Sequence, residues 1–159
     1  IDQIPSSFDR SIEPIDGPQP GINLPKIWKH EYENGISLYG TNHDELPLVS
    51  FGIEIEGGML LENPDKIGVA NLISDMMMEG TANKTPIELE EAIDDLGSSI
   101  STYTSAQAIH IEVNTLKRNF VPTLKIVKEI LFEPRWDSKE FDRIKRQTAE
   151  NIKRRSAVP

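Results

Sequence analysis

Three histidines are the side chains of this sequence best suited to metal or acid–base chemistry. They are His30, His43 and His110. Two metal ligands on one helical turn need positions i and i+4, and no two of these histidines have that spacing. We therefore interpret each histidine as a surface or strand residue and not as a ligand.

Other familiar catalytic patterns are missing from the sequence as well. There is no Gly-x-Ser-x-Gly nucleophile elbow and no glycine-rich phosphate loop of either common pattern. The run Met76-Met77-Met78 lies in a helical pattern and indicates core filling, not a soft-metal site. The acidic residues between positions 88 and 95 lack the glycine and the alternating oxygen ligands of a calcium loop. Residue types and spacing alone therefore show no catalytic set.

Composition narrows the class of protein further. The 159 residues are 37% hydrophobic and 27% charged, which suits one soluble domain with a core of ordinary size. The net charge of −9 disfavours binding to nucleic acid or to anionic lipid. The absence of cysteine excludes disulfides, thiol nucleophiles and cysteine metal sites. No apolar run is long enough to span a membrane.

The first half of the chain predicts a linker, a hairpin, a strand and two helices. Five of the 11 prolines lie in residues 1–25, which therefore cannot form a regular helix or central strand. Asn34-Gly35 predicts a tight turn between short strands at 27–32 and 36–41. Alternating apolar residues predict a half-buried strand at 49–55, and helical spacing predicts a helix at 69–77 that ends at Gly80. A capping box at Thr85-Pro86-Ile87-Glu88 predicts the start of a second helix.

The second half predicts two more strands followed by two helices. The strands cover 98–104 and 108–114, and a third helix begins near Phe120 and ends at Glu133-Pro134. A fourth helix begins at Asp137, with a narrow apolar stripe and a basic remainder that we interpret as a solvated face. This order predicts an α+β fold, with a mainly antiparallel sheet and helices packed on one face.

Residues 68–81 resemble the signature helix of the insulinase/pitrilysin family of zinc metallopeptidases, which includes the mitochondrial processing peptidases. The segment reads Gly-Val-Ala-Asn-Leu-Ile-Ser-Asp-Met-Met-Met-Glu-Gly-Thr. Active members have Gly-Leu-Ala-His-Phe-Leu-Glu-His-Met, followed by Gly-Thr at the same distance. Flanking motifs such as Asn34-Gly35, Gly57-Gly58 and Leu96-Gly97 occur in the family's order, so the resemblance covers about residues 26–155.

The resemblance also implies that the family's catalytic residues are replaced in this chain. Asn71 and Asp75 stand where the two histidine ligands belong, and Ser74 stands at the position of the general base. Asn151 stands at the position of the third ligand, a glutamate, whereas the adjacent Glu150 would point about 100° away around the helix. We therefore expect no catalytic, cofactor-binding or metal-binding residue in this segment, and we expect zinc in the active module of a longer protein.

The family resemblance implies a role in a longer, two-module protease. Residues 1–25 would be the linker between modules, and residues 26–159 would be the first part of the inactive module. The implied function is to help form the chamber in which the catalytic module of the same chain cleaves a peptide substrate. Similarity of the linker to that of large secreted bacterial members implies a periplasmic or cell-envelope location.

Two alternative functions are open at this point. The longer protein could be a degenerate homologue that serves only as a scaffold or partner subunit. Less favoured is an altered metal site, in which Asp75, Asn71, Asn151 and Glu79 would hold calcium or magnesium through hard oxygen ligands. A segment cut from a larger module would also expose apolar surface, which predicts that it forms homodimers or pairs through strand edges.

Overall fold

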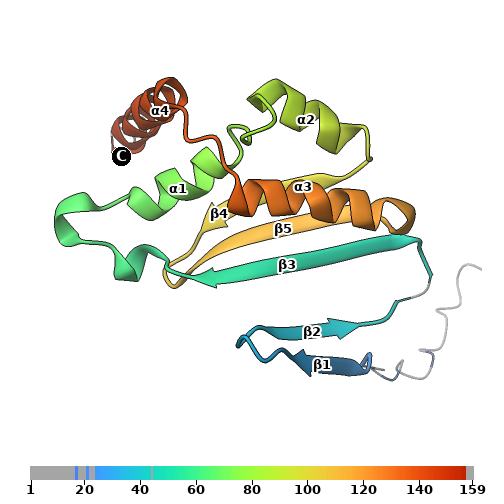
Figure 1. Ribbon diagram of the computed structural model, residues 1–159. Helices are drawn as coiled ribbons and strands as arrows, with labels where there is room; N and C mark the ends of the chain where they lie inside the picture. Colours follow the sequence, from blue (N-terminus) through green and yellow to red (C-terminus); the bar gives the residue numbers. More distant parts are fainter. Residues whose placement is uncertain (1–16, 18–20, 22–23, 44, 157–159) are drawn as a thin grey trace, which may run out of the picture. The chain divides into compact units, whose positions relative to one another are not determined.

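The computed structural model describes residues 17, 21, 24–43 and 45–156 (Figure 1). The chain divides into two compact units, Ile1–Asp44 and Glu45–Pro159, and each is described by itself. Most of the predicted linker at 1–25 lies outside the described residues, so that assignment stays a prediction.

The first unit contains a β-hairpin. Strands β1 (Ile27–Glu31) and β2 (Ser37–Thr41) pair in antiparallel fashion. Gly35 has φ +89°, a conformation that costs little only for glycine, and the amide of Tyr32 donates to the carbonyl oxygen of Ile36 at 2.8 Å. The turn predicted from Asn34-Gly35 is therefore confirmed.

The second unit is a two-layer α+β fold in which four helices lie on one side of a three-stranded sheet (Figure 1). Strand order in the sheet is β3-β5-β4, and both pairings are antiparallel. In chain order the elements are β3 (Leu48–Glu56), short 3-10 turns at Met59–Leu61 and Pro64–Lys66, α1 (Val69–Met77), α2 (Pro86–Asp94), β4 (Ser99–Thr104), β5 (Ala108–Leu116), a third 3-10 turn at Lys117–Asn119, α3 (Phe120–Phe132) and α4 (Ser138–Ser156).

The predicted fold class and order of elements are confirmed. In the described residues the first unit contains the two-stranded sheet β1-β2 and the second unit contains the three-stranded sheet β3-β5-β4, and every pairing is antiparallel. A hairpin needs only local pairing, and the residue pattern of a strand does not reveal which distant strand lies beside it.

The core lies between the sheet and the helices and follows from the alternation of side chains along the strands. On β5, Ile109, Ile111 and Val113 face the helices, whereas His110 and Glu112 face the opposite side. The buried cluster also takes Met77 from α1, so the methionine run fills the core as predicted. Its members are Met77, Leu89, Ile93, Ile100, Ile109, Ile111, Val113, Ile126, Val127 and Ile130.

The ends of the helices are fixed by specific caps. At α2 the Thr85 hydroxyl accepts from the Glu88 amide, and the Glu88 carboxylate accepts from the Thr85 amide at 2.8 Å, so the predicted capping box is confirmed. At α1 the Glu62 carboxylate accepts from the amides of Gly68 (2.9 Å) and Ala70 (2.7 Å). This cap comes from outside the helix and was not predicted. No helix in the described part of the chain has the length and apolarity that a membrane crossing requires.

Candidate functional site

A pocket of about 450 Å³ lies where α1, α4 and strand β4 meet. Asp75 and Glu79 line it from α1 and the turn that follows, and Arg143, Gln147 and Asn151 line it from α4. The contact between α1 and α4 thus brings Asp75 and Asn151 into one pocket although 75 residues separate them in the sequence. These are two of the four positions at which the family resemblance placed replaced catalytic residues.

The other two positions, Asn71 and Ser74, are not part of the pocket lining. Ser74 is buried, and its hydroxyl donates to the carbonyl oxygen of Asn71 at 2.9 Å and lies 3.0 Å from Oγ1 of Thr104. The Thr102 hydroxyl donates to the carbonyl oxygen of Ser74 at 2.7 Å. Ser74 therefore joins α1 to β4, and its hydroxyl is turned into protein contacts and away from the pocket.

Arg143 is the positively charged side chain that lines this pocket. Its guanidinium lies 2.6 Å from the Glu79 carboxylate and 2.7 Å from the Glu140 carboxylate, and it also donates to Gln147. The hydrogen bond to Glu79, followed by the one to Glu140, raises the pKa of Arg143 further above its already high value. Arg143 was expected on the solvated basic face of the fourth helix. Its side chain is 46% exposed, which agrees with that expectation, but the sequence did not predict the ion pair to Glu79, which forms only because α4 packs against α1 and the turn that follows it.

Asp75 is the carboxylate of the pocket that has no arginine partner. Its side chain reaches solvent, yet the surrounding protein removes part of its hydration, and this raises its pKa. The negative charge of Glu79 raises it further. Asp75 therefore holds a proton more readily than an ordinary aspartate does.

These residues do not fit a zinc ion. Zinc sites in proteins use thiolate, imidazole and carboxylate ligands in tetrahedral geometry, whereas Asn151 offers only an amide and Glu79 is already paired with Arg143. A guanidinium in the same pocket would also repel a second cation. Across residues 24–43 and 45–156, no group of three or more histidine, aspartate or glutamate side chains is arranged to hold a metal. The structure gives no support to the alternative calcium or magnesium site, because Asn71 does not line the pocket that contains Asp75.

The histidines lie among local neighbours. His30 on β1 packs edge to face against Tyr32, with ring centroids 4.5 Å apart, and His43 is exposed. His110 stacks on Tyr103 at 4.7 Å and is 2.9 Å from the Ser105 hydroxyl. These contacts agree with their interpretation as surface or strand residues.

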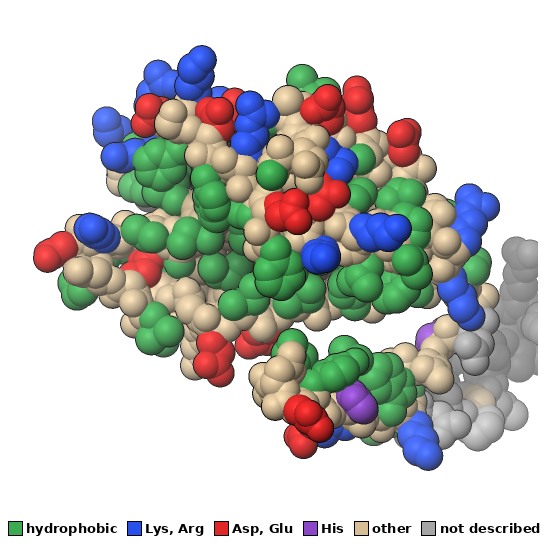
Figure 2. Space-filling model, in the orientation of Figure 1, with side chains coloured by type: hydrophobic (Ala, Val, Ile, Leu, Met, Phe, Trp, Pro, Cys, Tyr) green, Lys and Arg blue, Asp and Glu red, His purple; other side chains and the backbone are tan. Residues whose placement is uncertain are grey.

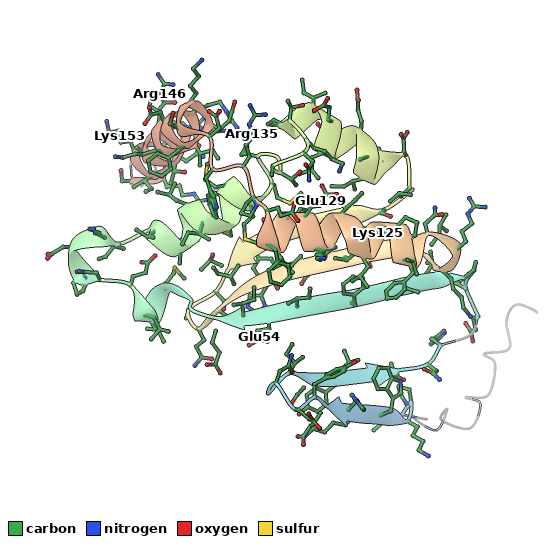
Figure 3. All side chains as sticks on the ribbon, in the orientation of Figure 1. Glu54, Lys125, Glu129, Arg135, Arg146 and Lys153 are labelled. Atoms are coloured by element: carbon green, nitrogen blue, oxygen red, sulfur yellow. The ribbon has the colours of Figure 1, made fainter. Side chains whose placement is uncertain are left out.

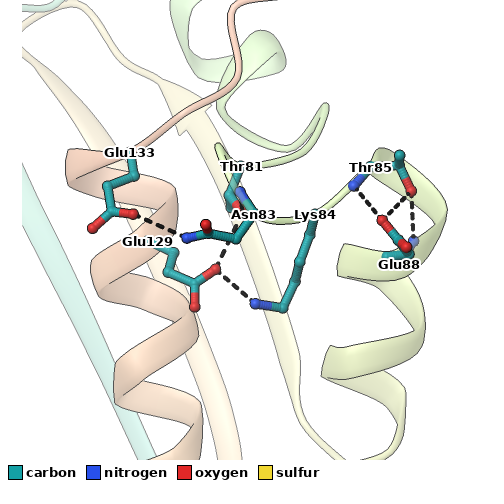
Figure 4. Close-up of polar contacts among 7 residues, drawn as sticks. All are labelled: Thr81, Asn83, Lys84, Thr85, Glu88, Glu129 and Glu133. Carbon is teal, nitrogen blue, oxygen red and sulfur yellow. Dashed lines mark hydrogen bonds and ion pairs between the residues drawn. The ribbon is translucent and has the colours of Figure 1, made fainter.

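A second polar centre joins the turn after α1 to helix α3 (Figure 4). The Glu129 carboxylate accepts from Lys84 Nζ at 2.7 Å and from the buried Thr81 hydroxyl at 3.1 Å. The hydrogen bond from Lys84 is the main cause of a lowered pKa of Glu129. One turn further on, Glu133 accepts from the side-chain amide of Asn83 at 3.1 Å. The Gly80-Thr81 pair of the signature segment therefore anchors the end of α1 and has no direct part in the pocket.

Basic and acidic side chains gather over different helices of the helix layer. Figure 2 shows basic side chains over α4 and acidic side chains over α2. Arg146 and Lys153 extend from α4 into solvent (Figure 3), as expected for a solvated face. The apolar stripe of α4 is only partly covered, because Ile144 is buried but Ile152 is 63% exposed.

This chain is similar to proteins that are named as peptidases. The model of the insulinase family, peptidase family M16, matches residues 41–159. The chain is 23% identical over 133 residues to a Bacillus subtilis protein named uncharacterized zinc protease YmxG. The alignment covers 84% of this chain and 32% of that protein. It is 25% identical over 135 residues to the beta subunit of the mouse mitochondrial-processing peptidase, covering 85% of this chain and 27% of the subunit.

Solved structures show the same fold. The peptidase M16 inactive domain from Pseudomonas fluorescens superposes with a TM-score of 0.79 at 20% identity and covers 84% of this chain and 33% of that one. A protease from Helicobacter pylori superposes with a TM-score of 0.70 at 19% identity, and the match covers 80% of this chain and 31% of the protease. This chain thus spans between about a quarter and a third of the length of the proteins it matches. Because the family model matches most of its residues, the chain belongs to the insulinase family of peptidases, peptidase family M16.

Proposed function

We propose that this chain is a non-catalytic segment of a longer two-module zinc metalloprotease, and that it helps form the chamber in which another module of the same protein cleaves peptides. The observation that carries the proposal is the pocket between α1 and α4. The family resemblance assigns Asp75 and Asn151 to two metal-ligand positions, and both line this pocket beside the Arg143–Glu79 ion pair.

The chemistry of these groups supports a structural role for the pocket. Hydrolysis of a peptide by this family needs a metal-bound water and a carboxylate base to take its proton. Ser74 is buried and bonded to the backbone, and the carboxylate of Glu79 is held by Arg143. The ion pair links the turn after α1 to α4 through protein side chains alone. The scaffold is therefore kept by interactions that need no metal.

A metal-retention experiment tests the proposal on the chain itself. The purified chain is loaded with zinc and dialysed, and its zinc content and its cleavage of a fluorogenic peptide library are measured. We expect neither stoichiometric zinc nor cleavage. The variant Asp75→His with Asn151→Glu is a positive comparison, because it adds two zinc ligands at the pocket, and we expect it to retain more zinc than the native chain. Stoichiometric zinc in the native chain would overturn the proposal.

The longer protein supplies a second test. We expect it to contain a His-x-x-Glu-His helix in its other module and to lose peptidase activity when residues 26–159 are removed. If no module carries that motif, the scaffold or partner-subunit function would replace our proposal. Cell fractionation would test the periplasmic or cell-envelope location, which stays a prediction.

A further inference from the structure

Asn34 and Gly35 form the turn of the β1–β2 hairpin, and this pair of residues is also suited to a spontaneous covalent reaction. The backbone nitrogen that follows an asparagine can attack the asparagine's side-chain carbonyl carbon and expel the side-chain nitrogen as ammonia. Glycine in the second place has no side chain to shield that nitrogen and adopts backbone angles closed to other residues. Asn34 is the only asparagine in the sequence that a glycine follows.

The closed turn engages the atom that would attack. The amide of Gly35 donates to the carbonyl oxygen of Tyr32 at 3.0 Å, and the amide of Tyr32 donates to the carbonyl oxygen of Ile36 at 2.8 Å. To react, the Gly35 nitrogen has to lose its proton, which is the proton held in the hydrogen bond to Tyr32. Reaction therefore requires that this hydrogen bond breaks first.

The side chain of Asn34 is restrained as well. Its Oδ1 accepts from the amide of Ile36, two residues along the chain, at 3.3 Å. The side chain must be free to rotate before its carbonyl carbon can meet the Gly35 nitrogen. Asn34 and Gly35 are both exposed, so water reaches the site. The turn thus offers a suitable pair of residues but restrains both reacting groups while it is closed.

We propose that Asn34 is a site of deamidation in this protein and that opening of the hairpin controls the rate. In the open turn, the Gly35 nitrogen bonds to the side-chain carbonyl carbon of Asn34. The proton of Gly35 passes through water to the side-chain nitrogen, which leaves as ammonia, and a cyclic succinimide remains. Water then opens the ring at one of its two carbonyl carbons and gives aspartate or isoaspartate. The chain and water supply every atom, and the reaction does not depend on the function proposed for the pocket.

Opening of the hairpin is accessible because an isolated pair of strands has little stability of its own. Trp28 on β1 supplies a cross-strand contact. Its ring packs over Gly40, where the Cβ atom of any other residue would collide with it, and its Nε1 donates to Oδ1 of Asn42 at 3.2 Å. Removal of the Trp28 side chain should therefore increase the fraction of open hairpin.

The isoaspartate product would alter the turn that formed it. In isoaspartate the main chain runs through the former side-chain carbonyl group, so the backbone gains one carbon atom. The positive φ of Gly35 (+89°) and the hydrogen bonds of the turn set the register of β1 against β2. A longer backbone at this point should break that register. The aspartate product keeps the backbone length and should keep the hairpin.

Peptide mapping by mass spectrometry during incubation of the full chain at neutral pH tests the proposal. We expect deamidation of Asn34 to be about tenfold slower in native buffer than in urea, where the chain is unfolded. Trp28→Ala should raise the rate in native buffer about fivefold, since it removes an aromatic cross-strand contact. Phe132→Ala is the matched control. It removes an aromatic side chain that is 74% exposed on α3, in the other unit, and should leave the rate at Asn34 unchanged.

Hydrogen exchange of the Tyr32 amide measures opening of the turn in the same three chains. The rate of deamidation should follow the measured opening. The Tyr32 amide should stay protected in Asn34→Asp and lose its protection in the purified isoaspartate form. Equal rates in native buffer and in urea, or no reaction at Asn34 in the unfolded chain, would overturn the proposal. A rate that does not follow the opening of the turn would overturn it as well.

Discussion

Glu129→Gln should destabilise the chain by about 1.5 kcal/mol through loss of one ion pair. The carboxylate of Glu129 is the acceptor that Lys84 and Thr81 share, so it ties the turn after α1 to helix α3. Glutamine keeps the shape of the side chain but removes the charge, so the Lys84 ammonium would lose its counter-ion. The substitution therefore isolates the electrostatic part of this contact.

The degree of burial of Lys84 and Glu129 determines how much the Glu129→Gln substitution should destabilise the fold. The side chains of Lys84 and Glu129 are 25% and 23% exposed, so the pair is neither fully solvated nor fully buried. Exposed pairs contribute up to about 1 kcal/mol, and hydrogen bonds to charged groups contribute about 1.5–3 kcal/mol. An intermediate value of about 1.5 kcal/mol corresponds to a fall in Tm of about 3–6 °C for a domain of this size.

Urea unfolding followed by circular dichroism measures the change in the free energy of unfolding. Glu133→Gln is the matched control, because Glu133 is the C-cap residue of α3 and bonds the exposed Asn83, and it should change stability by less than about 0.5 kcal/mol. A double-mutant cycle with Lys84→Met then gives the coupling energy of the pair. A coupling energy near zero would refute the reasoning.

The same pair predicts how stability depends on pH. Folding lowers the pKa of Glu129 from its ordinary value of 4.5, chiefly through the hydrogen bond from Lys84. A lowered pKa in the folded state means that this carboxylate stabilises the fold above pH 4.5 and loses its contribution as the pH falls through the folded value. The difference in stability between the native chain and Glu129→Gln should therefore shrink as the solution is made more acid than pH 4.5.

Two further predictions concern the core and a turn. Ile111→Ala removes a fully buried side chain from the central strand and should lower the free energy of unfolding by about 3 kcal/mol in urea denaturation, whereas Ile111→Val should cost only about 1 kcal/mol. Gly80→Ala should cost more in thermal unfolding than Gly57→Ala, because both glycines have positive φ but only at Gly80 would the new Cβ lie 2.6 Å from the carbonyl oxygen of Lys84. Equal losses at the two glycines would show that the close contact has no effect.

The outline of the fold could be predicted because its signals are local. The capping box at Thr85, the turn at Gly35 and the alternation along β5 each depend on residues within a few positions of one another. Proline at position 122 is tolerated because it falls in the first turn of α3. The strand order β3-β5-β4 was not predicted, because it depends on pairing between distant strands, which no local pattern encodes.

The candidate site was predictable only in part. Residue spacing indicated no site, but the family resemblance pointed to Asp75 and Asn151, and the structure places both in one pocket. Neither predicted that Ser74 is buried against β4 or that Arg143 lies in the pocket. A weak signal for Arg143 was present in Glu140, three residues earlier on the same helix face. The decisive partner, Glu79, lies 64 positions away and becomes a neighbour only when α1 meets α4.

The sequence by itself determined the helices and strands of this protein, their order and the residue types at the four family positions, since these follow from local propensity, periodicity and identity. Tertiary structure alone decided which of those residues share a pocket and that an arginine ion pair joins the turn after α1 to α4 there. The physical reason is that packing brings distant segments within a few ångströms, where charge, desolvation and hydrogen bonding act, and no periodicity along the chain records those distances.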